Sequence, residues 1–232
     1  MSNDYICCLC GDTIPPNPAN LDDALSMDHV PPKQFYPKEN RTARIPNLWV
    51  VPTHKRCNAD YRKDKEYFYH AVYPLVQDGN RTMGQAVYRD LMRRTHKPQT
   101  PAMTRRLLTR FKRVTDSGIH LPPGIVQFNL DACRVERVAI KISQGLFYLD
   151  ESRYLPRRNC KDIRLCQTEG EVPQLYQLSW RRGEAKSVLP GVFSYRRFEF
   201  ENLHLFSMLF WEAFMFCTAF EGPLAGSVLP PR

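Results

Sequence analysis

The sequence predicts an α+β protein, with a small metal-stabilised core at its N-terminus, then helices, then a mixed α/β C-terminal region. Three observations support this fold class: paired cysteine and histidine residues near the N-terminus, helical periodicity through the middle of the chain, and strand-like alternation near the C-terminus. We expect a core over residues 1–77, a basic helical region over 78–114, and an accessory region of unassigned role over 115–232.

Length and composition are those of a globular protein with an anionic partner. The chain has 232 residues, of which 43% are hydrophobic and 25% charged, and this suffices to bury a core. Its net charge of +9 favours nucleic acid as the partner. We find no signal peptide and no apolar run long enough to span a membrane, so we expect a cytoplasmic protein without membrane contact.

The expected secondary structure follows from prolines and periodicity. Eight prolines between residues 15 and 52 exclude long helices before Asn58. The later pattern predicts helices over about 59–77 (with Pro74 ending or kinking it), 82–95, 102–114 and 131–146, strands over 124–129 and 192–200, and a turn-rich segment over 149–184. Residues 203–220 fit one or two core strands or a buried helix, and a homodimer interface there stays open.

The helix expected over 102–114 carries a dense basic face. Arg105, Arg106 and Arg110 surround a narrow apolar stripe, and between Arg89 and Arg113 nine lysines and arginines stand against one acid, Asp90. Such a face suits a nucleic-acid phosphate backbone. The alternative is the solvated side of an ordinary amphipathic helix.

Two short pairs of metal ligands predict a structural zinc site. Cys7 and Cys10 form a C-x-x-C pair followed by a glycine, and His54 and Cys57 repeat the same spacing. Three thiolates and one imidazole complete a closed tetrahedral set for Zn2+. In the alternative, Cys8 is the fourth thiolate and His54 a surface residue. The other cysteines (Cys133, Cys160, Cys166 and Cys217) are scattered, and we interpret them as core or partly exposed thiols.

A second constellation lies between and beside these pairs. The segments SMDHVPPK, RIPNLWVV and HKRCNADYRKDKEYF place an Asp-His pair, a Pro-Asn-Leu and a Cys-Asn pair in that order. With the C-x-x-C pair before them, this order resembles the HNH endonuclease family, in particular a bacterial subgroup whose histidine motif continues as Asp-His-Val-Pro-Pro-Lys. The resemblance is dense over residues 7–68 and looser beyond, and it implies a ββα-metal nuclease core.

The resemblance also assigns roles to individual residues. It makes His29 the general base that activates water, a task that suits a neutral histidine near pH 7. Asp28 and Asn58 become the protein ligands of a catalytic divalent ion, Mg2+ or Mn2+, for which oxygen donors are suitable. Asn47 would orient the base through hydrogen bonds. Taken singly, His29 could be an ordinary histidine, Asn47 the start of a strand and Asn58 only a helix N-cap.

Three positions depart from the pattern of the family. His54 stands where many members have cysteine, and Asn58 where many have histidine. Lys65 replaces a glutamate that is common in the subgroup, so Asp64 or Glu66 would have to supply any such carboxylate. Flanking cations that could contact phosphates are Lys33, Lys55, Arg56 and Arg62.

The sequence therefore predicts a metal-dependent endonuclease, with DNA favoured over RNA as substrate. The alternative is a zinc-dependent nucleic-acid-binding protein without turnover, which explains the charge and the zinc ligands but not the joint occurrence of the four catalytic candidates. A third setting is a defence effector that a regulatory protein partner holds inactive until it is triggered.

Overall fold

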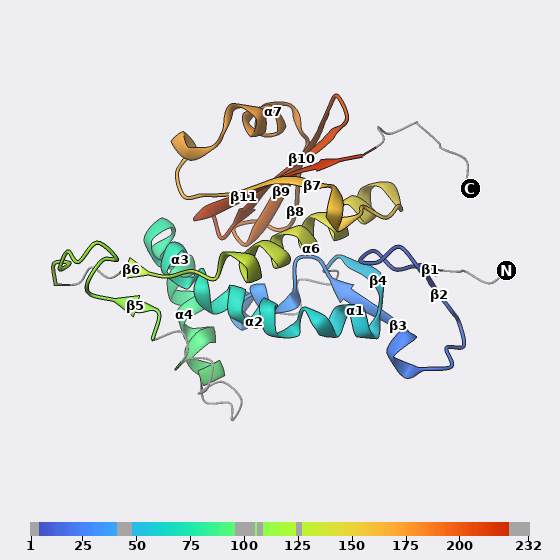
Figure 1. The fold of residues 1–232 in the computed structure, drawn as a ribbon, viewed down its shortest axis with the longest axis horizontal. Coiled ribbons are helices and arrows are strands. Elements are labelled where there is room, and N and C mark those ends of the chain that lie inside the picture. The colour runs from blue at the N-terminus through green and yellow to red at the C-terminus, as the bar shows by residue number, and fades with distance from the viewer. Residues whose placement is uncertain (1–4, 41–47, 96–104, 106–108, 124–126, 223–232) are drawn as a thin grey trace.

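The computed structural model of the chain describes residues 5–40, 48–95, 105, 109–123 and 127–222. One long helix, α6 (Ala132–Glu151), lies between a C-terminal sheet and the N-terminal segment (Figure 1). It contacts α2 and β4 on one side and β11 on the other. The chain thus forms successive layers, with α6 in the middle.

The N-terminal segment is built from two hairpins and three helices. Its elements are β1 (Tyr5–Ile6), β2 (Thr13–Ile14), β3 (Leu25–His29), β4 (Val50–His54), α1 (Lys55–Asp60), α2 (Arg62–Ala71) and α3 (Tyr73–Gly79). β3 pairs with β4 in antiparallel register, so that Asp28 lies opposite Val51. β3 ends at His29, directly before the segment Val30-Pro31-Pro32, because proline cannot donate to a strand ladder. A β-hairpin followed by a helix is therefore present.

The helix expected over 59–77 is instead three consecutive helices. The break between α1 and α2 falls at Tyr61, and the break between α2 and α3 falls at Val72, two residues before Pro74. Helical structure begins at Lys55, earlier than expected, with His54 at the N-cap. Asn58 therefore lies inside α1 and neither opens the helix nor caps it, which corrects that expectation.

The basic region agrees with the sequence in its first half only. Helix α4 (Arg81–Thr95) matches the helix expected over 82–95. The helix expected over 102–114 is wrong at its end, because Phe111–Lys112 forms β5 and pairs with β6 (Gln127–Phe128). The ring centroids of Phe111 and Phe128 lie 4.7 Å apart in a tilted arrangement, so the apolar residue expected on a helix stabilises a hairpin. Of the expected stripe, Leu107 and Leu108 lie outside the described residues.

The C-terminal region is a five-stranded antiparallel sheet, with α6 on one face and α7 on the other. Its strands and second helix are β7 (Cys160–Cys166), α7 (Gln174–Arg182), β8 (Ala185–Leu189), β9 (Phe193–Phe200), β10 (Leu203–Phe210) and β11 (Phe214–Glu221), and the strand order is β7-β11-β10-β9-β8. Residues 203–220 are two strands, one of the open alternatives. The segment 149–184, expected to be mixed and turn-rich, contains the end of α6, β7 and α7 with turns between them.

The two faces of the sheet follow the alternation of side chains along its strands. Phe206, Met208 and Phe210 of β10 are buried in the larger core on the α6 side. Leu205 faces a smaller core with Tyr176 of α7, and the Ser207 hydroxyl lies 2.5 Å from that of Ser179. Because both faces are covered, β10 is almost continuously buried, and its sequence shows little strand alternation.

The larger core joins the N-terminal and C-terminal regions. Phe35 and Phe68 stack at 4.8 Å, and both pack against Phe210. The indole Nε1 of Trp211 donates to the backbone oxygen of Phe35 at 3.0 Å. The expected division at residues 77 and 114 stays a prediction. Every helix among the described residues is too short or too polar to cross a lipid bilayer.

We predict that His70 makes the fold sensitive to mild acid. Burial, followed by the charge of Arg94, lowers the pKa of His70 to about 4, from an unfolded value of 6.5. Between these values the unfolded chain binds a proton that the folded chain does not, so stability falls as the pH drops from 6.5 toward 4. Urea unfolding across this range should show a loss of at most about 3 kcal/mol from this group. His70→Gln should flatten the profile, and an unchanged profile would contradict the assignment.

Candidate functional site

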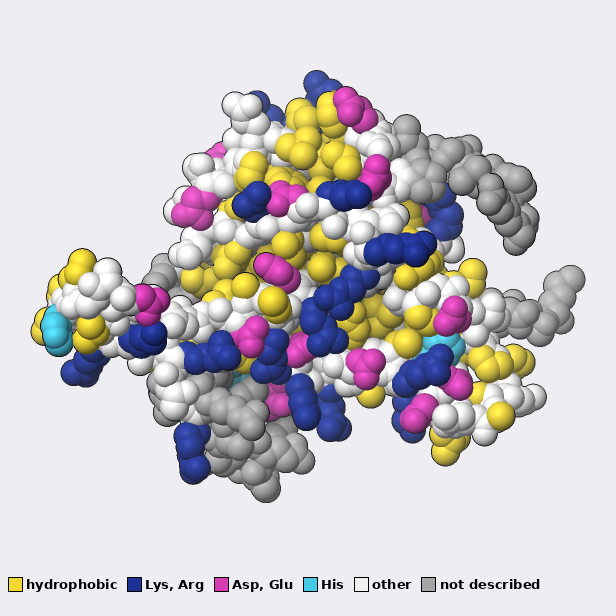
Figure 2. Space-filling view, viewed as in Figure 1, with side chains coloured by type: hydrophobic (Ala, Val, Ile, Leu, Met, Phe, Trp, Pro, Cys, Tyr) yellow, Lys and Arg dark blue, Asp and Glu magenta, His cyan; other side chains and the backbone are white. Residues whose placement is uncertain are grey.

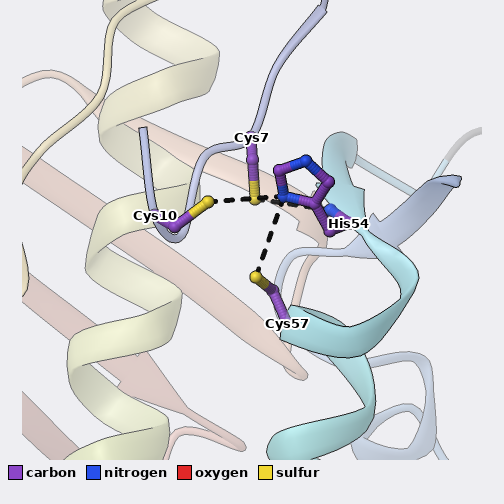
Figure 3. Close-up of side chains that lie close together, drawn as sticks. All are labelled: Cys7, Cys10, His54 and Cys57. Atoms are coloured by element: carbon purple, nitrogen blue, oxygen red, sulfur yellow. Dashed lines mark hydrogen bonds between the residues drawn. The ribbon is translucent and has the colours of Figure 1, made fainter. Parts of the chain in front are cut away.

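Four potential metal ligands meet at one end of the N-terminal segment (Figure 3). Cys7 and Cys10 lie in the turn between β1 and β2, where the Gly11 amide donates to the Cys7 oxygen at 2.9 Å. Gly11 has a φ of +85°, a conformation that favours glycine. His54 ends β4 and Cys57 lies one turn into α1. The ligand atoms of these four residues all lie within 4.8 Å of one another.

The spacing within this cluster fits a tetrahedral ion. His54 Nδ1 lies 3.3 Å from Cys10 Sγ and 3.9 Å from Cys57 Sγ. A tetrahedron with ordinary zinc–sulfur and zinc–nitrogen bonds has sulfur–nitrogen edges of about 3.6 Å. The cluster could therefore hold a structural metal such as zinc. Cys8, the alternative ligand, belongs instead to the hydrophobic core, and its amide donates to the Pro52 oxygen at 3.0 Å.

We predict that Cys10→Ser protein retains less than one equivalent of zinc, because a serine hydroxyl replaces one of the required thiolates. Cys133→Ser is the matched control, since Cys133 is exposed on α6, and it should keep the full equivalent. Metal content of the purified variants measures both. A full equivalent of zinc in Cys10→Ser protein would exclude this ligand set.

A second cluster brings together Asp28, Asn58, Lys65 and Lys141, from β3, α1, α2 and α6 respectively. The ammonium of Lys141 contacts Asp28 Oδ2 directly. The Lys65 ammonium donates to Asn58 Oδ1 at 2.8 Å and lies 3.6 Å from Asp28 Oδ1. Lys141 also lies 3.5 Å from Asn58 Oδ1. The two expected metal ligands thus come together, and two lysines bind both of them.

These four groups lie largely away from solvent. Asp28 is 5% exposed and Lys141 is 4% exposed. Burial, followed by the charge of Lys141, lowers the pKa of Lys65 to about 8. The Tyr61 ring lies 5.2 Å from the Lys141 ammonium and covers it on one side. The charge of the Asp28 carboxylate is therefore compensated by the Lys65 and Lys141 ammonium groups, and solvent contributes little.

His29 lies beside this cluster and lines a basic pocket. Its backbone N–H donates to Asp28 Oδ1 at 3.0 Å, which ties the end of β3 to the buried carboxylate. The pocket has a volume of about 700 Å³ and is lined by Asp28, His29, Pro32, Lys33, Gln34, Lys38, Lys65, Asp90, Arg93 and Arg94. Five of these ten residues are lysine or arginine and two are aspartate, so the pocket suits an anion.

The remaining expected site residues are distributed unevenly. Lys33 lines the pocket. Lys55, Arg56, Arg62 and Arg105 are exposed, and Arg56 pairs with Asp23 at 2.9 Å. Arg110 is half-buried and pairs with Asp131 at 3.4 Å, so its charge is partly engaged within the protein. Asn47 and Arg106 lie outside the described residues. Figure 2 shows lysine and arginine interspersed with acidic side chains on this face, rather than forming one continuous basic surface.

Asp64, one of the two acids that could replace the carboxylate missing at residue 65, is engaged elsewhere. Asp64 is buried and pairs with Arg134 and Arg137 of α6, each at 2.7 Å. Its charge is therefore used to hold α2 against α6. The side chain that reaches Asp28 and Asn58 from α2 is Lys65 itself.

Sequence reasoning missed Lys141 and the pocket residues Lys38, Arg93 and Arg94. Lys141 had a recognisable signal, because it is a lone charge within the apolar run Val-Ala-Ile-Lys-Ile, where lysine is almost never buried without a partner. Arg93 and Arg94 had none, since helical periodicity does not say which face of α4 lines a pocket. Arg94 bonds to Asp90 and to the backbone oxygen of Gln34, and so links α4 to the residues that follow His29.

The donor set at Asp28 and Asn58 does not fit a divalent ion in this arrangement. The oxygens that would coordinate it already accept hydrogen bonds from ammonium groups. A divalent ion beside two ammonium groups would meet like charges within a few ångströms in a poorly solvated place.

Comparison of the chain with protein-family models, curated proteins and solved structures found no match.

We predict that Lys141→Met destabilises the protein by about 3 kcal/mol, because it leaves Asp28 buried without its closest counter-charge. Adding Asp28→Asn should recover a large part of this loss, since the uncompensated charge is then gone. Lys161→Met is the matched control: Lys161 pairs with Glu221 on the surface, where a pair contributes less than about 1 kcal/mol. Urea unfolding measures all three variants, and equal losses for Lys141→Met and Lys161→Met would contradict this account.

Proposed function

We propose that this chain is a nuclease that hydrolyses phosphodiester bonds, with His29 as the general base and DNA favoured over RNA as substrate. The observation that carries the proposal is the basic pocket, which His29 lines and which has the Asp28–Asn58–Lys65–Lys141 cluster beside it. The Cys7–Cys10–His54–Cys57 cluster, for which we propose Zn2+ as the ion, would stabilise the N-terminal segment that carries His29.

The proposed reaction needs a base, a phosphate site and charge compensation. His29 accepts a proton from a water molecule, whose oxygen attacks phosphorus while the bond from phosphorus to the leaving oxygen breaks. The leaving oxygen takes up a proton from solvent. Lys33, Lys38 and Lys65 line the pocket and would oppose the negative charge that develops on the phosphate. The hydrogen bond from the His29 backbone N–H to Asp28 Oδ1 fixes the backbone of the base at the end of β3.

Several expectations remain attached to this proposal. Asn47 as an orienting residue and a homodimer or regulatory partner stay predictions, whereas the proposal includes no Mg2+ or Mn2+ at Asp28 and Asn58, since ammonium groups already occupy those oxygens. The second candidate function is nucleic-acid binding without turnover. The exposed cations Lys55 and Arg62 favour binding, but they do not account for a histidine beside a buried carboxylate.

We predict that purified protein nicks or linearises supercoiled plasmid, and that His29→Ala lowers the rate by about 10²-fold or more, because the base is gone. His120→Ala is the matched control, since His120 is exposed outside the pocket, and its rate should stay unchanged. Parallel reactions contain Mg2+, Mn2+ or no added divalent ion. Cleavage that survives in His29→Ala would exclude His29 as the base, and plasmid binding without cleavage in all reactions would favour the second function.

A further inference from the structure

The net charge around Asp28 equals that of a carboxylate with a divalent ion, although the oxygens of Asp28 and Asn58 are already bound by ammonium groups. One carboxylate with two ammonium groups carries a net charge of plus one, provided by Asp28, Lys65 and Lys141. A carboxylate with one divalent ion would carry the same net charge. The amide oxygen of Asn58 completes the correspondence, because it accepts from both ammonium groups.

We propose that the Lys65–Lys141 ammonium pair takes the place of a catalytic divalent ion in this chain, so that the site works without binding Mg2+ or Mn2+. The role assigned to the pair in cleavage rests on the proposed nuclease function. Its exclusion of a divalent ion does not.

The two lysines have different parts in this arrangement. Lys141 is almost fully buried, does not line the pocket, and contacts the inner oxygen of Asp28. It is a positioning residue that neutralises the carboxylate. Lys65 is 13% exposed in its side chain, bridges Asp28 and Asn58, and lines the pocket. Its ammonium is the cation that faces the phosphate.

The pair is held by the fold and cannot easily give way to an ion. Lys141 sits in the middle of α6, and one turn later Gly145 lets this helix approach Val30, the residue after β3: a Cβ there would lie 2.5 Å from Val30 Cγ2. Moving the Lys141 ammonium away would strand a buried charge against the Tyr61 ring and the core. Displacement by a divalent ion therefore costs more than filling an open site would.

Binding of Mn2+ to zinc-loaded protein, followed by electron paramagnetic resonance, tests the exclusion without requiring activity. Wild-type protein should bind no Mn2+ at this site. Lys65→Glu replaces the ammonium by a third oxygen donor beside Asp28 and Asn58, and it should bind one Mn2+ at least about tenfold more tightly than wild type. One equivalent of Mn2+ on the wild type that Asp28→Asn abolishes would overturn the proposal.

Two further variants keep this test specific. Lys63→Glu makes the same charge change on an exposed position of α2 and should gain no Mn2+ site. Lys65→Gln removes the ammonium without adding a carboxylate and serves if Lys65→Glu does not fold, as judged by circular dichroism and zinc content. At least one of the two Lys65 variants must bind Mn2+ more tightly than wild type. If both variants fold and neither gains Mn2+ binding, the proposal is overturned.

Cleavage in buffers freed of divalent ions by a chelating resin, with protein-bound zinc retained, tests the catalytic part. Wild-type protein should cleave plasmid there, and Lys65→Gln should be slower by about 10²-fold. Cleavage only with added Mg2+ would overturn the ammonium pair while the nuclease stands. No cleavage in any buffer, together with no Mn2+ binding to wild type and a gain in a Lys65 variant, would sink the nuclease while the exclusion of the ion stands.

Discussion

The buried carboxylate of Asp28 sets the constraint on which the arrangement of the N-terminal segment depends. A carboxylate that is 5% exposed must be paired, since an isolated charge in the protein interior is very costly. Its partners come from the end of β3, from α2 and from α6, so three elements must converge on one point. This convergence places His29 in the lining of the pocket and holds α6 between the two halves of the chain.

The Cys3His cluster and the Asp28 cluster share one short helix. Cys57 belongs to the first and Asn58 to the second, and both lie in α1, which has only six residues. A helix of this length is marginal by itself. A metal ion held by Cys7, Cys10, His54 and Cys57 would fix this helix against β4, and the amide of Asn58 would then be fixed relative to Asp28. The structural cluster and the candidate catalytic cluster are therefore mechanically linked.

Sequence reasoning identified the residues with strong local signals and missed those defined by tertiary packing. Ligand spacing is a local property, and it predicted Cys7, Cys10, His54 and Cys57 correctly as a group. Periodicity found α4 and α6. It failed at Phe111, where the partner that makes a hairpin, Phe128, is far along the chain. It also could not show that Lys141 meets Asp28, because 113 positions separate them.

Residue 65 shows why a motif and the assembled cluster can indicate different chemistry. The motif alone suggests oxygen ligands for a metal ion, whereas in the folded chain Lys65 binds those oxygens. Glutamate at this position would add a negative charge beside Asp28 and would attract an exchangeable cation. Lysine reverses that charge and itself donates to the oxygens that such a cation would need. Lys141 adds a second ammonium beside Asp28, and this cation, unlike a bound ion, is covalently part of the chain. The oxygens of Asp28 and Asn58 are therefore already occupied by cations that belong to the chain itself.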